Sequence, residues 1–206
     1  TNLEDETGER NEFNYIAALS QKLNRWGLAY LDLGTGSFRI GEFETAAELA
    51  AEILRLGPRE FVVSKKLDAA VLKNNAPGRL GSPVINEYDD WVFDVDAGAS
   101  RILEQLHIAS LSSLGIAEWP AAIAAAGALL YYLKDNLHKS LAHVKKPRPF
   151  YPADHMSLDT QTLKNLELFP HEYRDAPSLY SMLDETITPM GARLLSLWIK
   201  RPLIDP

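Results

Sequence analysis

Short runs of aliphatic and aromatic residues follow a polar beginning, and each run has the length and composition typical of a strand. Three of them precede the first helical pattern, at 13–19, 26–33 and 37–43. Gly34-Thr35-Gly36 separates the last two runs, and its glycines predict a hairpin turn. A further apolar run at 61–63 is typical of a short buried strand.

A helix with clear end signals is predicted between the third and fourth of these runs. Thr45 and Glu48 have the capping-box spacing, in which each side chain can satisfy an amide that the first turn leaves unpaired. Gly57-Pro58 marks the end of the helix. Strands, then a helix, then another strand indicate an α/β domain with a mixed sheet and flanking helices.

The rest of the chain is mainly helical, after a turn-rich loop at 73–83 and a strand-like run at 84–95. One helix is predicted from an apolar stripe of helical spacing, at Ala99, Ile102, Leu103 and Leu106. Trp119-Pro120 begins an alanine-rich helix that we expect to be buried, because small side chains let neighbours approach closely. Further helical patterns cover 157–169, 178–185 and 188–200.

The composition is that of a globular protein, with 46% hydrophobic and 24% charged residues. The absence of cysteine excludes disulfides, thiolate metal sites and cysteine nucleophiles. A formal net charge of −7 argues against a basic surface over the whole molecule. The longest apolar run, 121–133, is too short to cross a bilayer. We expect the acidic residues 1–12 to be a disordered tail, and both ends to be cut from a longer protein.

Asp32, which precedes the glycine turn, is the residue whose context best suggests metal-dependent chemistry. An aspartate at the end of a strand begins the phosphate loop of actin-like ATPases and holds metal in ribonuclease-H-like nucleases. Such chemistry needs more than one carboxylate, and the neighbouring strands offer only Glu42. We therefore expect Gly34 and Gly36 to form a turn and nothing more, and we keep a hydrolase that uses Asp32 as an alternative function.

Other catalytic signatures are absent from the sequence. It contains no GxxxxGK[ST] phosphate loop, no GxSxG elbow and no HExxH pair. The histidines are spaced so that no two share a helical face with a carboxylate, and we expect no metal site from His107, His138, His143, His155 and His171. The sequence therefore predicts no catalytic residue, no cofactor-binding residue and no metal ligand.

Basic residues gather in the segment 134–149, where Asp135 is the only acid. Pro147 and Pro149 interrupt any regular element, and we interpret the segment as a connection between domains. Four of its residues are candidate phosphate contacts, because each cation can release a counterion from nucleic acid: Lys139, Lys145, Lys146 and Arg148. An independent DNA-binding module built on this segment is a second alternative function.

Several phrases of the sequence resemble the MutS family of DNA mismatch-repair proteins. In the second half, AAGALLYYL at 125–133 is similar to a helix of that family, and 156–168 follow its pattern M-x-LD-x-x-T-x-x-NLEL. TPMGARLL, Trp198 and RPLIDP complete the resemblance within 188–206. In the first half, NYIAAL, GLAYLDL and WVFD look like parts of the family's connector domain.

The resemblance implies two domains. Residues 13–140 would form the connector, a ribonuclease-H-like α/β domain without a nuclease role, and 141–206 the beginning of the helical core, or lever, domain. The segment would be non-catalytic and would couple the mismatch-binding domain to the clamp and ATPase domains. An apolar helix face at Leu194, Leu195 and Trp198 would then lack its normal partners.

The resemblance also implies the cofactors and partners of the parent protein. ATP and Mg would bind elsewhere in that protein, a DNA-dependent ATPase, and none of its nucleotide-binding or mismatch-reading residues falls in this segment. Expected partners are mismatched double-stranded DNA, a second MutS-like subunit and a MutL-like protein, with no membrane, in the cytoplasm. We place the MutL contact on the solvent side of the helix before His107, at Ser100, Arg101 and Glu104.

Overall fold

The computed structural model describes residues 14–67, 83–137, 144–151, 155–156, 158, 160–170 and 177–204. The acidic segment 1–12, most of the loop at 73–83, and Lys139 lie outside the described residues. The described chain divides into two compact units, one within 14–152 and one within 153–206, and each is described by itself.

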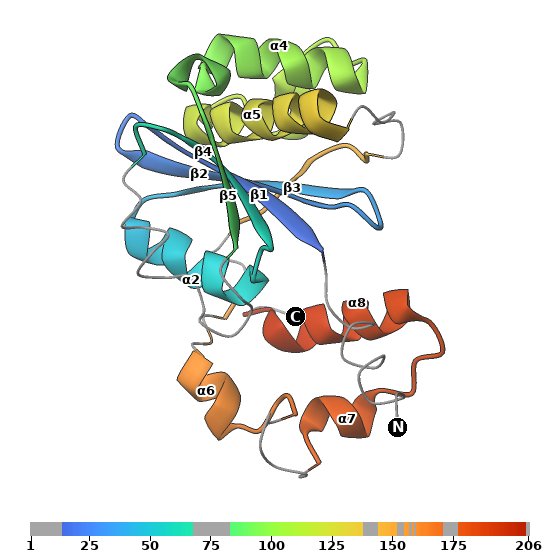
Figure 1. The fold of residues 1–206 in the computed structure, drawn as a ribbon. Helices are drawn as coiled ribbons and strands as arrows, with labels where there is room; N and C mark the ends of the chain where they lie inside the picture. Colours follow the sequence, from blue (N-terminus) through green and yellow to red (C-terminus); the bar gives the residue numbers. More distant parts are fainter. Residues whose placement is uncertain are drawn as a thin grey trace. The chain divides into compact units, whose positions relative to one another are not determined.

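The first unit is built on a six-stranded mixed sheet (Figure 1). Its strands stand in the order β5-β4-β1-β2-β3-β6. β2 is antiparallel to β1 and to β3, whereas β4 is parallel to β1, β5 to β4 and β6 to β3. The strands are β1 Tyr15–Lys22, β2 Arg25–Asp32, β3 Ser37–Phe43, β4 Glu60–Ser64, β5 Val84–Tyr88 and β6 Arg148–Pro149. The expected α/β arrangement, a mixed sheet with flanking helices, is confirmed.

The first hairpin turns through two residues with a left-handed backbone, Leu23 at φ 50° and Asn24 at φ 60°. Positive φ at both central positions is the type I′ pattern, whose twist matches that of the strands it joins. β1 and β2 consequently pair over their full lengths. Leu23 is 84% exposed, so the turn holds a large side chain in an unfavourable backbone region without burying it.

Helix α2, Ala46–Leu56, begins and ends where the sequence predicts. The Thr45 hydroxyl accepts a hydrogen bond from the amide of Glu48 at 3.2 Å, and Gly57 has the left-handed φ of 56° that often follows a helix. The other half of the capping box differs from expectation, because the Glu48 carboxylate accepts from the amide of Glu44 at 3.1 Å. α2 covers one face of the sheet (Figure 1).

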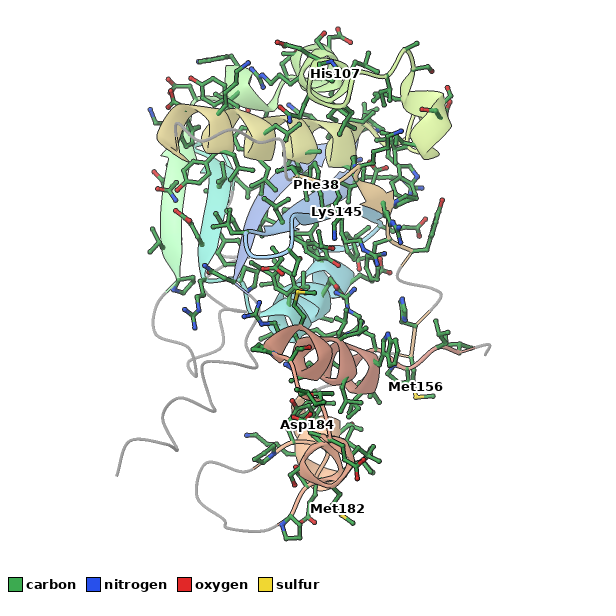
Figure 2. All side chains as sticks on the ribbon, turned by 90° about the vertical axis from the view of Figure 1, so that its right-hand side faces the viewer. Phe38, His107, Lys145, Met156, Met182 and Asp184 are labelled. Carbon is green, nitrogen blue, oxygen red and sulfur yellow. The ribbon has the colours of Figure 1, made fainter. Side chains whose placement is uncertain are left out.

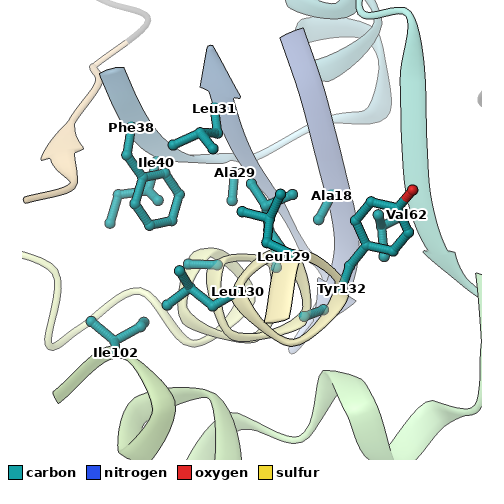
Figure 3. Packing of buried hydrophobic residues seen from close by; sticks show 14 of the residues in the cluster. Ala18, Ala29, Leu31, Phe38, Ile40, Val62, Ile102, Leu129, Leu130 and Tyr132 are labelled. Atoms are coloured by element: carbon teal, nitrogen blue, oxygen red, sulfur yellow. The ribbon is translucent and has the colours of Figure 1, made fainter. Parts of the chain in front are cut away.

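Two longer helices form layers on the other face (Figure 1). α5, Pro120–Leu137, packs across the central strands of the sheet, and α4, Val95–Leu106, packs on α5. Every residue from 121 to 130 is buried, as the alanine-rich composition predicts, because α5 is covered on both sides. The cluster between these layers (Figure 3) includes Leu31, Ile40, Ile102 and Leu129.

The strand-like run at 84–95 is only partly a strand. β5 ends at Tyr88, and a 3-10 helix, η1, spans Asp90–Phe93 before α4 begins. The prediction of a continuous extended run was therefore wrong in its second half. Asp94 explains the change of structure, since its side chain accepts a hydrogen bond from the amide of Ala97 at 2.9 Å and so caps α4.

α4 and α5 cross with their backbones in contact at Gly98 and Gly127. A Cβ atom on Gly127 would overlap the Cα atom of Gly98 and lie 3.1 Å from its carbonyl carbon. A Cβ atom on Gly98 would lie 2.8 Å from the carbonyl oxygen of Ile123. Carbon atoms pack best at about 3.5–4.0 Å, so this helix separation requires glycine at both positions. A second 3-10 helix, η2 Leu111–Leu114, lies in the connection from α4 to α5.

The basic segment interpreted as a connection is partly regular. Residues 134–137 continue α5, and 148–149 form β6 beside β3. The amides of Lys145 and Phe150 donate to carbonyl oxygens in or next to β3, at 2.9 and 2.8 Å. Pro147 and Pro149 did not prevent this pairing. Proline lacks a backbone N–H, and an edge strand needs no hydrogen-bond donor on the side that faces away from the sheet. The first unit consequently reaches residue 152, beyond the boundary at 140 that the resemblance implies.

The second unit is helical, with α6 Thr160–Asn165, α7 Leu179–Leu183 and α8 Pro189–Lys200. α8 begins where the sequence predicts, because the Thr188 hydroxyl accepts a hydrogen bond from the amide of Gly191 at 3.1 Å. α6 is shorter than the helix predicted at 157–169. Glu167 follows it with a φ of 49°, which cannot continue a right-handed helix.

Candidate functional site

The partner surface predicted on α4 contains three residues that differ in exposure. Ser100 and Glu104 are exposed, and Arg101 is half-buried. The Ser100 hydroxyl donates to the carbonyl oxygen of Asp96 at 2.9 Å. Glu104 lies 3.7 Å from the ammonium of Lys134 on α5, and both side chains are 75% exposed. An ion pair with that exposure contributes little to stability, so Glu104 can exchange it for a partner.

Arg101 is held in place by the residues around it. Its Nη1 donates to the carbonyl oxygen of Val92 at 2.7 Å. Its guanidinium carbon lies 5.1 Å from the ring centroid of Tyr131 and 5.9 Å from that of Trp91. These two rings meet edge to face with centroids 5.4 Å apart. Trp91 is 58% exposed. The surface therefore presents a tryptophan whose orientation is held by its contacts with Arg101 and Tyr131.

Trp91 and Tyr131 extend the surface beyond the residues that sequence reasoning found. Trp91 lies in η1 and Tyr131 in α5, so neither shares an element with Arg101. The sequence carries only a weak signal that Trp91 is exposed. Trp91 follows Asp89 and Asp90, and no periodic pattern of apolar residues there tells an exposed tryptophan from a buried one. We call Trp91, Ser100, Arg101, Glu104 and Tyr131 the α4 surface.

Asp32 is used within the turn that follows β2. It is fully buried, and its carboxylate accepts hydrogen bonds from the Thr35 hydroxyl at 2.6 Å and the amide of Gly34 at 3.2 Å. An aspartate that bonds to the backbone two residues ahead is a common turn former. Gly36 has a φ of 67°, which favours glycine. The geometry supports the turn and gives no support to the Asp32 hydrolase.

Glu42 lies at the other end of the same hairpin. Asp32 on β2 is opposite Ser37 on β3. Ser37 precedes Glu42 by five residues on that strand, so Asp32 and Glu42 are about 17 Å apart. The Glu42 carboxylate accepts hydrogen bonds from the amides of Ala121 and Ala122, at 2.9 and 3.3 Å, where α5 begins. Burial raises the pKa of Glu42 above 4.5, although these two amides oppose the shift. Within the described ranges, no group of three or more His, Asp or Glu side chains could hold a metal ion.

Three of the four candidate phosphate contacts lie in the described chain and share one edge of the sheet. Lys145, Lys146 and Arg148 are exposed. Figure 2 shows Lys145 at this edge, near Phe38 of β3. β6 also places Arg148 beside Arg39 of β3, a residue that sequence reasoning did not single out because the pairing of these strands was not foreseen.

Large apolar side chains are exposed on the second unit. Leu194 and Trp198 of α8 are 43% and 64% exposed, whereas Leu195 is half-buried. Ile187 and Met190, near the start of α8, are 100% and 66% exposed. No described helix, in either unit, has the length and apolar character to cross a membrane.

Two family models match this chain. MutS domain II matches residues 14–145, and MutS domain III matches residues 161–206. Among curated proteins, DNA mismatch repair protein MutS of Protochlamydia amoebophila (strain UWE25) is 36% identical over 197 residues, which are 93% of this chain and 23% of that protein.

The MutS proteins of Solibacter usitatus (strain Ellin6076) and Desulfatibacillum aliphaticivorans are 35% and 32% identical over 201 and 200 residues. These alignments cover 94% and 96% of this chain, and 23% and 22% of the two relatives. The chain thus spans about a quarter of the length of the curated relatives it matches. With domain II, the connector, over the mixed sheet and domain III over the helical unit, the chain belongs to the MutS family of DNA mismatch repair proteins.

Proposed function

We propose that this segment of MutS transmits conformational change between the mismatch-binding domain of the whole protein and its clamp and ATPase domains, and catalyses no reaction itself. Mismatched double-stranded DNA, ATP with Mg, and a second MutS subunit would be bound by the whole protein. Family membership supports this proposal, and so does the path of the chain as it leaves domain II.

The coupling role is supported by the chain segment that leaves domain II, because this segment is bound to the sheet. Phe150 is 3% exposed, and its amide donates to the carbonyl oxygen of Ile40 at 2.8 Å. Its ring centroid lies 6.4 Å from that of Phe43. The chain is therefore attached to the sheet up to this residue. An attached exit passes on a rotation of the sheet, whereas a flexible linker would absorb it.

Phe150→Ala in the whole MutS protein tests the coupling role. Loss of the ring loosens the exit, so we expect mismatch-stimulated ATP hydrolysis to fall toward the basal rate while mismatch binding is retained. Phe61→Ala is the matched control, because Phe61 on β4 is 1% exposed and its loss opens a cavity away from the exit. Full stimulation in Phe150→Ala, or an equal loss in both variants, would reject the coupling role.

The α4 surface is our proposed contact for a MutL-like protein. A few residues supply most of the binding energy at protein interfaces, and tryptophan, tyrosine and arginine are enriched among them. Trp91, Tyr131 and Arg101 already hold one another in place, which lowers the entropy that a partner's binding must overcome. Ser100 and Glu104 supply polar groups at the side of this cluster.

Recruitment of MutL by the whole MutS protein tests the α4 surface. Truncating an anchoring tryptophan costs about 2 kcal/mol or more, so Trp91→Ala should weaken recruitment about 30-fold. Arg101→Glu combined with Glu104→Lys reverses both charges and should also weaken it. Leu23→Ala is the control, because Leu23 is an exposed apolar residue in the β1–β2 turn. Unchanged recruitment in the α4 variants would reject this surface.

A further inference from the structure

Two arginines occupy adjacent strands at the β6 edge of the sheet. The parallel register of β3 and β6 places Arg39 opposite Arg148. Register partners on neighbouring strands point to the same face, with backbones about 5 Å apart. Phe43 and Phe150, which follow the two arginines by even numbers of residues, meet with ring centroids 6.4 Å apart. This contact supports the same-face placement of the arginines.

The four cations at this edge have no acidic partner in the described part of the chain. None of Arg39, Lys145, Lys146 and Arg148 takes part in an ion pair there. Lys145, Lys146 and Arg148 are exposed, and Arg39 is half-buried. Like charges opposite each other on neighbouring strands repel. An anion between the arginines would remove that repulsion.

The acids of the same hairpin are already engaged. Glu42 accepts hydrogen bonds from the first amides of α5, and it lies 4.0 Å from Arg25. Glu44 pairs with the same arginine at 3.2 Å. The charge of Arg25 is thus neutralised by Glu42 on β3 and by Glu44 just after it. No acid in the described chain neutralises Arg39 on the same strand. The contrast marks the β6 edge as a site for an anion from outside the described chain.

We propose that Arg39 and Arg148, with Lys145 and Lys146, bind the phosphate backbone of a nucleic acid. The planar guanidinium group matches the geometry of phosphate oxygens. Lys145, Lys146 and Arg148 follow one another along the exposed edge, and Arg39 lies opposite Arg148 on the next strand. This arrangement suits a row of phosphates better than a single ion. The site adds Arg39 to the contacts that the sequence predicts, and it is independent of the coupling role and of the α4 surface.

The binding should be weak, independent of base sequence and sensitive to salt. Each phosphate contact contributes about 0.9 to the slope of log affinity against log salt, so four contacts give a slope of about −3.6. A fourfold rise in salt, from about 50 to 200 mM, then weakens binding about 150-fold. Removing one cation lowers this ratio to about 40-fold, and removing two lowers it to about 12-fold.

Fluorescence anisotropy of a labelled duplex of about 30 base pairs, titrated with the 206-residue chain at the two salt concentrations, tests the site. The variants are Arg39→Gln, Arg148→Gln and the double substitution. Arg25→Gln is the matched control, because it removes the same charge from the same sheet at a neutralised position. Thermal unfolding of each variant shows whether it remains folded.

We expect both single variants to lower the salt ratio, the double variant to lower it further, and Arg25→Gln to leave it unchanged. Absence of duplex binding at the lower salt concentration would overturn the proposal. So would an equal effect of Arg25→Gln, because binding would then follow net charge alone. Pyrophosphate that raises the melting temperature without duplex binding would instead identify a small phosphate ligand and also overturn it.

Discussion

The glycine contact between α4 and α5 gives a quantitative test of the packing in domain II. Gly127→Ala adds one methyl group at the crossing, where it would overlap the Cα atom of Gly98 and lie 3.1 and 3.2 Å from its carbonyl carbon and oxygen. These are backbone atoms and cannot rotate aside. The helices must separate, which disturbs the buried cluster between them.

The net effect is the difference between two opposing terms. Alanine favours the helix over glycine by about 0.8–1.0 kcal/mol. Overpacking costs about 1–3 kcal/mol, and we take the upper value because only backbone lies in the way. We therefore expect Gly127→Ala to lower the free energy of unfolding by about 2 kcal/mol, which corresponds to a fall in Tm of about 4–8 °C.

Thermal and urea unfolding of the chain, followed by circular dichroism, measure this change. Ser100→Ala on the exposed side of α4 is the control, and we expect an effect within about 0.5 kcal/mol. In the double variant with Gly98→Ala, one separation of the helices relieves both overlaps. The combined loss should therefore be smaller than the sum of the single losses. A Gly127→Ala protein as stable as the parent, or more stable, would refute the reasoning.

Substitutions at three further positions test the hairpins by urea unfolding. Leu23→Asn should raise stability by about 1 kcal/mol, because asparagine tolerates the left-handed backbone better than leucine, and no gain would argue against the turn type. Asp32→Ala should cost about 1–3 kcal/mol, and Asp32→Asn less, because asparagine keeps an oxygen acceptor for the turn; equal costs would contradict this role. Glu42 has a native pKa raised above 4.5 by burial, so its contribution to stability is present below that pH and declines as pH rises through the native value. Glu42→Gln should remove this decline, and an unchanged pH profile would show that Glu42 is not its source.

Local signals in the sequence predicted the elements whose ends depend on their own residues. α2 is bounded by Thr45 and Gly57, and α8 begins after Thr188, because capping side chains and a left-handed glycine act within a few residues. The turn at Asp32 was likewise predicted from its glycines, although the carboxylate's part in it was not. The resemblance to the MutS family, carried by longer phrases, was confirmed.

Features that depend on distant contacts were missed. β6 contains Pro149 and lies in the segment interpreted as a connection, since only its pairing with β3 makes 148–149 a strand. Arg101 was placed toward solvent by helical spacing, but the positions of Trp91 and Tyr131 make it half-buried. A helical stripe reports which side of a helix is apolar, and it carries no information about aromatic rings brought from other elements.

The place of α5 in the chain has a consequence for synthesis. β1, β2 and β3 are consecutive and pair with one another, so this meander can form as soon as it leaves the ribosome. The helix that covers it begins only at Pro120. At a translation rate of roughly 5–20 residues per second, about 5–20 s pass between the synthesis of β3 and that of α5. During this time α5 does not yet cover the apolar face of the meander. Nascent domain II is therefore open to chaperones and to aggregation during that interval, and slower translation between β3 and α5 would prolong it.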